Sequence, residues 1–320
     1  MPGRRTIGVD MGGSKLLAGA VDAELSVHSR TQRPLLGLDQ AAVLDVAVEA
    51  VEEVQALGNG EFSAVGFGIP CTIDHRTGRA VMAVNLPLAD IMFGEVMAER
   101  LGLPVFVDND ANLAVLAEHR RGAATGASEV VMLTVGTGIG GGLVLGGSVY
   151  RGSIGAGAEL GHTVIDLGGP RCQGNCPNHG CIEVMASGTA LAREAVRIAG
   201  ERPGSALAAA LADGQALVGP LVTELAYEGD PAALEVLELI GTRLGVAIAS
   251  FVNTFNPQVV VVGGGVMAAG ELLLSPARAA VAERALPPAR DEVQIVSAAF
   301  GVEAGMVGAG AFAFDCLAGL

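Results

Sequence analysis

The sequence predicts an α/β fold made of two domains. A chain of 320 residues is too long for one ordinary core and has the length expected of two domains. Its composition, with 51% hydrophobic residues, 17% charged residues and 47 glycines, is typical of a well-buried protein with many tight turns. A unit of apolar strand, glycine-rich turn and apolar strand occurs at residues 6–22 and again at residues 129–150, which indicates an internal duplication.

Apolar strands alternate with amphipathic helices along the chain. In residues 40–56, for example, acids lie on one helical face and Ala, Val and Leu on the other, as expected of a surface helix. Further helices are expected at residues 109–121, 187–199, 231–255 and 302–317. Strands are expected at residues 6–10, 16–22, 64–70, 104–108, 258–262 and 294–298, in addition to the two strands of residues 129–150.

Composition argues against two classes of partner. With a net charge of −15 the chain is not expected to bind nucleic acid, because a binder needs a basic face to displace counterions from phosphates. The longest charge-free run, residues 244–270, is interrupted by Asn253, Asn256, Pro257 and three consecutive glycines. It therefore predicts a buried helix, a turn and a buried strand, and no membrane partner. The expected partner is a small molecule.

The turn after the first strand, MGGSK, has the features of a phosphate cradle. Gly12 and Gly13 let backbone N–H groups approach an anion, and Ser14 adds a hydroxyl. Asp10 at the strand end could hold Mg²⁺ directly or through water. Lys15, the only lysine of the chain, could contact a phosphate or could simply be solvated. Alone this segment could be an ordinary hairpin turn, but its repetition later in the chain favours a nucleotide site.

The second glycine turn, GTGIGGG in residues 129–150, carries Thr137 and Gly138 as candidate phosphate contacts. It also contains the spacing GxGxxG of dinucleotide-binding proteins. That fingerprint must open a helix, whereas the following LVLGGSVY predicts a strand, so we reject the dinucleotide interpretation. A third turn, with Gly264 and Gly265, suits the purine and ribose side of a nucleotide or a plain connection from strand to helix.

A strand-to-helix junction carries three polar residues in a row, Asp108, Asn109 and Asp110. An Asp in this position is often only a helix cap. Three such groups are more than one cap needs, however, and a carboxylate at the mouth of a parallel sheet is placed for general-base work.

Residues 157–188 combine histidines, cysteines and acids in one short span. Cys172, Cys176 and Cys181, spaced CxxxCxxxxC, follow His162 and offer the donors that a tetrahedral zinc ion prefers. Buried thiols in a glycine-rich loop and disulfides are the alternatives. An odd number of clustered cysteines and a start without a secretory signal disfavour disulfides. His179 could compete with His162 for the fourth ligand position.

Two acids flank these proposed ligands. Glu159 lies three residues before His162, and Glu183 lies two residues after Cys181. Closing a metal site would bring both carboxylates toward one place. A structural metal that positions carboxylates suggests a site for a polyhydroxylated ligand.

With these residues in hand, the chain resembles the ROK family of sugar kinases, most of all its bacterial glucokinases, over nearly its whole length. DMGGSK resembles the first phosphate loop of the family, TVGTGIGGG the second and VVVVGGGV the adenosine-side turn. NLP and DNDAN resemble its sugar-facing segments, and GAELGH followed by a cysteine cluster ending in GCIE is the most specific match. The chain departs from the family in having three residues between its first two cysteines, where one is usual.

The resemblance implies the two-lobed actin-like (ribonuclease H-like) ATPase fold with duplicated βββαβαβα-type domains. The smaller lobe would comprise residues 1–108 plus 302–320 and the larger lobe, with the zinc loop, residues 109–301. Sugar and ATP would meet between the lobes. Closure of the lobes would then exclude water as a competing acceptor.

By the same resemblance, Asp110 would be the base that takes the proton of the sugar 6-hydroxyl. The sugar-binding residues would be Asn85, Asn109, Asp110, Glu159, His162 and Glu183. The nucleotide-binding residues would be Asp10, Gly12, Gly13, Ser14, Lys15, Thr137, Gly138, Gly264 and Gly265, acting with Mg²⁺. The structural zinc ligands would be His162, Cys172, Cys176 and Cys181.

The expected function is thus ATP-dependent phosphorylation of the 6-hydroxyl of a hexose, most simply glucose. Another hexose (fructose, mannose or an N-acetylhexosamine) or polyphosphate as donor is the rival within kinases. A sugar-responsive ROK-type transcriptional regulator is the non-enzyme alternative. It is disfavoured because only nine residues precede Asp10, too few for a helix-turn-helix, and the net charge is wrong for DNA. A cytoplasmic homodimer or homotetramer is expected.

Overall fold

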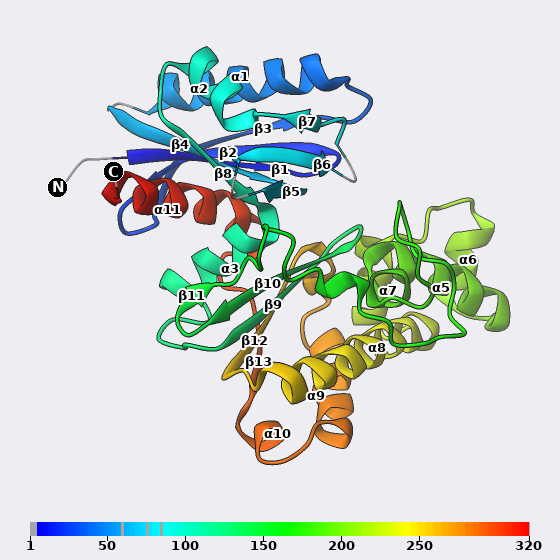
Figure 1. Ribbon diagram of the computed structural model, residues 1–320. Helices are drawn as coiled ribbons and strands as arrows, with labels where there is room; N and C mark the ends of the chain where they lie inside the picture. The colour runs from blue at the N-terminus through cyan, green and yellow to red at the C-terminus, as the bar shows by residue number, and fades with distance from the viewer. Residues whose placement is uncertain (1–4, 59–60, 75–76, 84–85, 320) are drawn as a thin grey trace. The chain divides into compact units, whose positions relative to one another are not determined.

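The computed structural model describes residues 5–58, 61–74, 77–83 and 86–319 (Figure 1). The chain divides into two compact units. Unit 1 comprises Met1–Ser128, Gly142–Ala158 and Val302–Leu320, and unit 2 comprises Glu129–Gly141 and Glu159–Gly301. The lobe boundaries expected from the sequence, 1–108 plus 302–320 and 109–301, stay a prediction.

Unit 1 is built on a five-stranded sheet of order β3-β2-β1-β4-β8. Its strands are β1 (Arg5–Met11), β2 (Lys15–Asp22), β3 (Val27–Pro34), β4 (Phe62–Ile69) and β8 (Val105–Asn109). The first three strands pair antiparallel, and β4 and β8 continue the sheet parallel to β1. The strands predicted at residues 6–10, 16–22, 64–70 and 104–108 are confirmed. Strand β3 was missed, because its sequence VHSRTQRP is mostly polar and half of it faces solvent.

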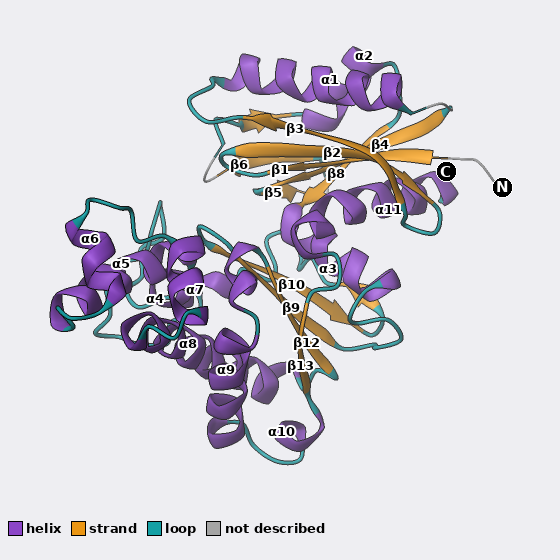
Figure 2. Cartoon of the chain, turned by 180° about the vertical axis from the view of Figure 1, so that it is seen from behind, coloured by secondary structure: helices purple, strands orange, loops and turns teal. Residues whose placement is uncertain are grey.

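Helices cover both faces of this sheet (Figures 1 and 2). On one face lie α1 (Gln40–Leu57) and α2 (Phe93–Leu101), and on the other lie α3 (Asp110–Arg121) and α11 (Ala304–Ala318). Helix α1 buries an apolar stripe of helical period that includes Val43, Ala47 and Val54. A three-stranded sheet of β5 (Cys71–Asp74), β6 (Arg79–Ala83) and β7 (Ala89–Ile91) also belongs to unit 1.

Helix α11 is the core helix of unit 1. The window Gly301–Ala318 is long and apolar enough to cross a membrane, but 50% of it is buried, because α11 packs on β1, β4 and α3. The approach is so close that a Cβ added to Gly66 on β4 would lie 1.9 Å from the carbonyl oxygen of Ala309. The hydroxyl of Thr6 donates to the carbonyl oxygen of Gly310 at 2.9 Å in the same contact.

The second sheet repeats the strand order of the first, β11-β10-β9-β12-β13. Its strands are β9 (Val130–Val135), β10 (Ile139–Leu145), β11 (Ser148–Val149), β12 (Val259–Gly263) and β13 (Gln294–Ser297). Strand β12 lies parallel to both β9 and β13, as β4 lies parallel to β1 and β8. The shared order confirms the duplication predicted from the two glycine-turn units.

Residues 142–145 of β10 and all of β11 fall within unit 1, and the other strands of the second sheet within unit 2. The remaining elements of unit 2 are mostly helical. They are η1 (Leu160–His162), α4 (Ile182–Ala186), α5 (Gly188–Glu201), α6 (Ala206–Ala212), α7 (Gly219–Tyr227), α8 (Pro231–Phe255), η2 (Gly265–Ala269), α9 (Glu271–Arg284) and α10 (Ala289–Glu292). A third short helix, η3 (Gly301–Glu303), precedes α11. The charge-free run 244–270 forms the end of α8, a turn with Asn256 in the left-handed conformation, the buried strand β12 and η2.

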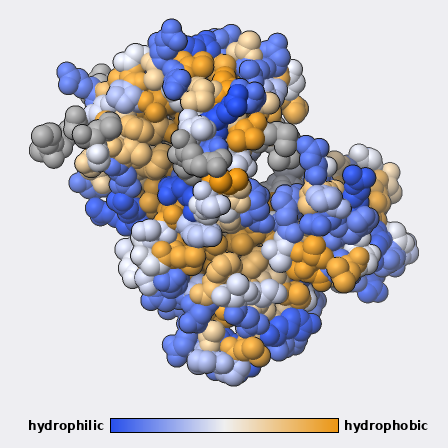
Figure 3. All heavy atoms as spheres, in the orientation of Figure 1, coloured by the Kyte–Doolittle hydropathy of each residue, from blue (hydrophilic) through white to orange (hydrophobic). Residues whose placement is uncertain are grey.

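Apolar side chains also reach the surface singly. On the face drawn in Figure 3, hydrophilic and hydrophobic residues are interspersed. Among the described residues, Leu36 in unit 1 is 80% exposed and Leu167 in unit 2 is 91% exposed. Scattered exposure of this kind is normal for a protein surface.

The close contact between β4 and α11 makes a stability prediction. We expect Gly66→Ala to lower the free energy of unfolding by about 2 to 3 kcal/mol, because the added methyl overlaps backbone that cannot move aside without shifting α11. The matched control is Gly200→Ala, where no atom lies within 4 Å of an added Cβ, and which should be neutral or stabilising. Urea unfolding of both variants measures the difference; equal midpoints would contradict the packing described for α11.

Candidate active site

The first glycine turn joins β1 and β2 in unit 1. The amide of Gly12 donates to the carbonyl oxygen of Lys15 at 2.8 Å and closes the turn. Ser14 and Lys15 are exposed in it, and Gly12 and Gly13 are half-buried. The turn borders a pocket of about 410 Å³, whose lining includes Asp10, Lys15 and the ion pair between Arg30 and Glu303.

The carboxyl group of Asp10 has a raised pKa. Burial raises the pKa of this carboxyl to about 7, the charge of Asp110 acts in the same direction, and Lys15 opposes the shift. Gly305 of α11 lies directly against the carboxylate, since a Cβ there would be 2.6 Å from it. A cation bound beside the two carboxylates would favour their ionised forms.

The three polar residues at the strand-to-helix junction have three different surroundings. Asp108 is buried and accepts hydrogen bonds from the Arg151 Nε at 2.6 Å and from the Asn112 Nδ2 at 3.2 Å. The Arg151 guanidinium also lies 5.5 Å from the ring centroid of Phe312. Asp108 is therefore a structural ion-pair partner, which the sequence did not identify.

Asn109 and Asp110 begin α3. The Oδ1 of Asn109 accepts from the amides of Ala111 at 2.9 Å and Asn112 at 3.3 Å, so Asn109 is the N-cap. Asp110 is the first residue of the helix and lies against Gly68 of β4, where a Cβ would be 3.4 Å from its Cα; Gly68 in turn pairs with Asp10 of β1. Unit 1 thus brings together the candidate base and the acid of the first glycine turn.

The second glycine turn lies in unit 2 and is followed by β10, so it does not open a helix. The amide of Gly136 donates to the carbonyl oxygen of Gly138 at 2.9 Å within the turn. The third glycine turn packs against the residue that precedes the second. Gly264 has a φ of +91°, and a Cβ there would lie 2.4 Å from the carbonyl oxygen of Val135. The candidate nucleotide contacts Thr137 and Gly138 therefore lie in a turn that begins beside Gly264 and Gly265.

Glu183 is tied directly to the second glycine turn. Its Oε2 accepts a hydrogen bond from the amide of Ile139 at 3.0 Å. A Cβ at Gly138 would lie 2.4 Å from the same oxygen, so the carboxylate packs directly against this glycine. Gly161, next to His162, also packs against this point, because a Cβ there would lie 2.0 Å from the carbonyl oxygen of Ile139.

The beginning of α5 adds two more bonds to the same turn. The amide of Gly188 donates to the carbonyl oxygen of Gly136 at 2.8 Å, and the hydroxyl of Thr189 donates to the carbonyl oxygen of Thr137 at 2.8 Å. The sequence presented the acid-and-cysteine segment and the glycine turn as separate motifs. The structure joins them within one unit.

The four proposed zinc ligands converge. The ligand atoms of His162, Cys172, Cys176 and Cys181 all lie within 4.8 Å of one another. The Nδ1 of His162 lies 3.5 Å from the Sγ of Cys172, and the Sγ atoms of Cys176 and Cys181 lie 3.9 Å apart. His179 is exposed, with its Nδ1 3.2 Å from the carbonyl oxygen of Gly169, and stands outside the cluster. The structure therefore favours His162 over His179.

Burial controls protonation in this part of unit 2. It raises the pKa of Cys172 to about 12, and the neighbouring thiols of Cys181 and Cys176 add to the shift. Burial also raises the pKa of Glu159; His162 opposes that shift and Glu183 reinforces it. These shifts favour the protonated forms of Cys172 and Glu159, and a bound cation would oppose them.

Of the sequence-predicted site residues, Asn85 lies outside the described residues. Within unit 1 the structure brings Asp10 and Asp110 together. Within unit 2 it brings Glu159, His162 and Glu183 together with the second glycine turn. Sequence reasoning missed the contacts of Arg151, Gly161 and Thr189. The only local signal for Arg151 and Thr189 was that each follows directly after a motif, and Gly161 lies inside the motif GAELGH.

Comparison with known proteins shows the family of the chain. The chain is 35% identical over 315 residues to a glucokinase of Halalkalibacterium halodurans, which covers 97% of this chain and 95% of that enzyme. A solved structure of a ROK family glucokinase from Streptomyces griseus, in complex with glucose and AMPPNP, matches with a TM-score of 0.89 and 34% identity. That match covers 97% of this chain and 99% of the other.

The xylose repressor of Bacillus subtilis is more distant, at 26% identity over 313 residues, which cover 97% of this chain and 77% of the repressor. The ROK family itself matches residues 6–315. With that span, and with glucokinases similar over nearly their full length, the fold is the actin-like ATPase fold and the chain belongs to the ROK family.

Proposed function

We propose that this protein is an ATP-dependent hexose kinase that phosphorylates the 6-hydroxyl of glucose. The observation that carries the proposal is the proximity of Asp110, at the start of α3, to Asp10, just before the first glycine turn: Asp10 pairs with Gly68 of β4, and a Cβ at Gly68 would lie 3.4 Å from the Cα of Asp110. A proton acceptor beside a phosphate-binding turn is the arrangement that phosphoryl transfer to an alcohol needs. The similarity to glucokinases supports glucose as the acceptor.

In the proposed reaction Asp110 accepts the proton of the 6-hydroxyl. The hydroxyl oxygen forms a bond to the γ-phosphorus of ATP while the bond to the leaving oxygen of ADP breaks. Backbone amides of the glycine turns stabilise the charge on the transferring group. Mg²⁺, when bound with ATP near Asp10, supplies charge neutralisation of the phosphates.

The remaining hydroxyls of the sugar would be held by Asn85, Asn109, Glu159, His162 and Glu183. The roles proposed for two of them follow from their other contacts. The Oδ1 of Asn109 caps α3, so a hydroxyl would meet its Nδ2 donor. The Nδ1 of His162 faces Cys172, so a hydroxyl would meet its Nε2.

We further propose one structural Zn²⁺ bound by His162, Cys172, Cys176 and Cys181. Three sulfur atoms and one ring nitrogen within 4.8 Å form a donor set that suits tetrahedral zinc. Four protein ligands leave no open position, so the metal would hold the loop that carries Glu159 and Glu183 and would take no part in the reaction. The residues present fit the ion.

The setting of the enzyme is proposed on the family resemblance. It would act in the cytoplasm, in glycolysis, as a homodimer or homotetramer. A coupled assay over a panel of hexoses, with ATP and with polyphosphate as donors, tests the substrate assignment. Preference for a hexose other than glucose, or for polyphosphate, would replace that part of the proposal.

Asp110→Asn tests the base. An amide keeps hydrogen-bonding capacity but cannot accept the hydroxyl proton, so kcat should fall about 100- to 10,000-fold while glucose still binds, as measured by calorimetry. The control is Asp39→Asn, an exposed N-cap of α1 at which asparagine caps equally well. A kcat for Asp110→Asn above about a tenth of the wild-type value would rule out this role.

Asp10 makes stability depend on pH. Its pKa is about 7 in the folded protein against 3.8 for an ordinary Asp, so between these values the folded state holds a proton that the unfolded chain releases. This stabilising contribution is complete below the ordinary pKa and is lost as pH rises through about 7. We expect the urea midpoint of the wild type, relative to Asp10→Asn, to fall from about pH 5 to about pH 8. Parallel pH curves for the two proteins would contradict the environment described for Asp10, including the effects of Asp110 and Lys15.

Cys176→Ala tests the metal. The wild type should contain about one zinc per chain, and the variant should lose it, unfold at a lower temperature and bind glucose more weakly. Cys316→Ala is the control, because that thiol lies on α11 outside the cluster. Elemental analysis, thermal unfolding and glucose titration make the comparison. A zinc-free wild type would refute the metal site.

A further inference from the structure

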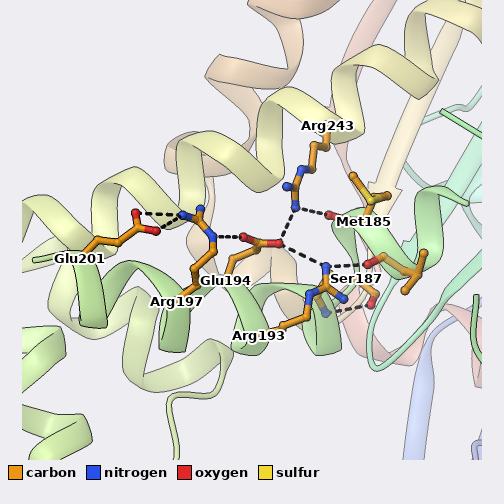
Figure 4. Close-up of polar contacts among 9 residues, drawn as sticks. Met185, Ser187, Arg193, Glu194, Arg197, Glu201 and Arg243 are labelled. Carbon is orange, nitrogen blue, oxygen red and sulfur yellow. Dashed lines mark hydrogen bonds and ion pairs between the residues drawn. The ribbon is translucent and has the colours of Figure 1, made fainter. Parts of the chain in front are cut away.

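Helix α5 of unit 2 carries a buried carboxylate. The side chain of Glu194, on α5, is only 8% exposed and accepts hydrogen bonds from three arginines (Figure 4). Its Oε1 accepts from Arg243 at 3.0 Å and from Arg193 at 3.2 Å, and its Oε2 accepts from Arg197 at 2.8 Å. Burial opposes ionisation, but the hydrogen bonds from Arg197 and Arg243 outweigh it and lower the pKa of Glu194 to about 2. The acid is therefore charged at every working pH.

Two of these arginines also bind the backbone of α4. Arg193 donates to the carbonyl oxygen of Val184 at 2.8 Å, and Arg243 of α8 donates to the carbonyl oxygen of Met185 at 3.1 Å. The same Nη1 of Arg243 serves both Met185 and Glu194. Glu194 thus fixes two guanidinium groups, and each of them holds one carbonyl group of α4 (Figure 4).

Helix α4 needs such partners because it has only five residues, and the last carbonyl groups of a helix lack intrahelical donors. The amide of Gly188 would be the regular donor to Val184. It donates to Gly136 of the second glycine turn instead. Arg193 therefore donates to the carbonyl oxygen of Val184 in place of Gly188, whose amide holds the turn.

The hydrogen bonds to the α4 backbone are relevant to binding because α4 carries Glu183. Glu183 is its second residue, and its carboxylate holds the amide of Ile139 at 3.0 Å, directly after the glycine turn. A shift of α4 would move this carboxylate and the turn together. Positioning groups of an active site tolerate little displacement, since about 1 Å can cost on the order of 100-fold in rate.

We propose that Glu194, with Arg193 and Arg243, positions Glu183 and the second glycine turn, and so determines hexose affinity without touching the hexose. Glu194 is a positioning residue in this scheme and not a catalytic one. Its effect on hexose affinity rests on the proposed kinase function, whereas its effect on the glycine turn does not.

Arg243→Lys is the primary test variant. It keeps the positive charge near Glu194, but both bonds of Arg243 are donated by Nη1, and the lysine side chain ends one bond short of that atom, so its ammonium cannot reach both acceptors in the same geometry. The matched control is Arg197→Lys, which makes the same chemical change at the other oxygen of Glu194. Arg197 binds Glu194 and Glu201 and contributes to neither of the α4 bonds described above. Glu194→Gln is used only as a second variant, because removal of one charged member of a buried ionic cluster can prevent folding.

Two measurements separate positioning from general stability. In the ligand-free protein, amide hydrogen exchange of a peptide covering residues 136–141 should be about tenfold faster in Arg243→Lys and unchanged in Arg197→Lys. In kinetics, the KM for glucose should rise about tenfold in Arg243→Lys with a smaller change in kcat, and stay at the wild-type value in Arg197→Lys. Where Glu194→Gln folds, it should follow Arg243→Lys in both measurements.

Equal exchange of residues 136–141 in the two arginine variants would overturn the inference, whatever the enzyme phosphorylates. Faster exchange with an unchanged KM would overturn the link to hexose affinity. A wild type without hexose kinase activity would refute the proposed function, but the exchange measurement would still decide whether Glu194 positions the turn.

Discussion

The hydrogen bond from the amide of Ile139 to Glu183 is the contact on which the arrangement of unit 2 depends. It joins a strand of the sheet to a five-residue helix in the segment inserted between β11 and α8. The carboxylate also lies against Gly138, where an added Cβ would be 2.4 Å from Oε2, so a side chain there would displace this carboxylate oxygen. This contact therefore couples the second glycine turn to α4, which follows directly on Cys181.

Most of the fold could be predicted from the sequence because its signals are local. Apolar periodicity located most strands of the two five-stranded sheets, and the repeated glycine turn indicated the duplication that the shared strand order confirms. Strand β3 escaped because its polar, half-exposed sequence matches a loop as well as a strand. Its place is set by pairing with β2, which is a contact between chain segments and not a property of its own residues.

The candidate site was only partly predictable for the same reason. Motif resemblance pointed to Asp110, Glu183 and the cysteines. It could not predict that Asp108 forms an ion pair with Arg151 or that Asn109 caps α3. Those assignments depend on partners that are distant in sequence. Glu194 did leave a local signal, since it falls on the buried stripe of α5 between Leu191 and Ala195. A charged residue at a core position of an amphipathic helix indicates a buried partner.

The two copies of the fold carry an acid near the glycine turn in different ways. In unit 1, the strand that precedes the glycine turn carries its own carboxylate, Asp10, next to its last residue Met11 and against α11. The equivalent strand in unit 2, β9, has the sequence VVMLTV and carries no acid. There the acid beside the turn is Glu183, from the five-residue helix α4. The buried carboxylate of Glu194 binds Arg193 and Arg243, and these arginines hold the backbone of α4. The acid near the turn is thus positioned by the strand itself in one copy and by a hydrogen-bonded network in the other.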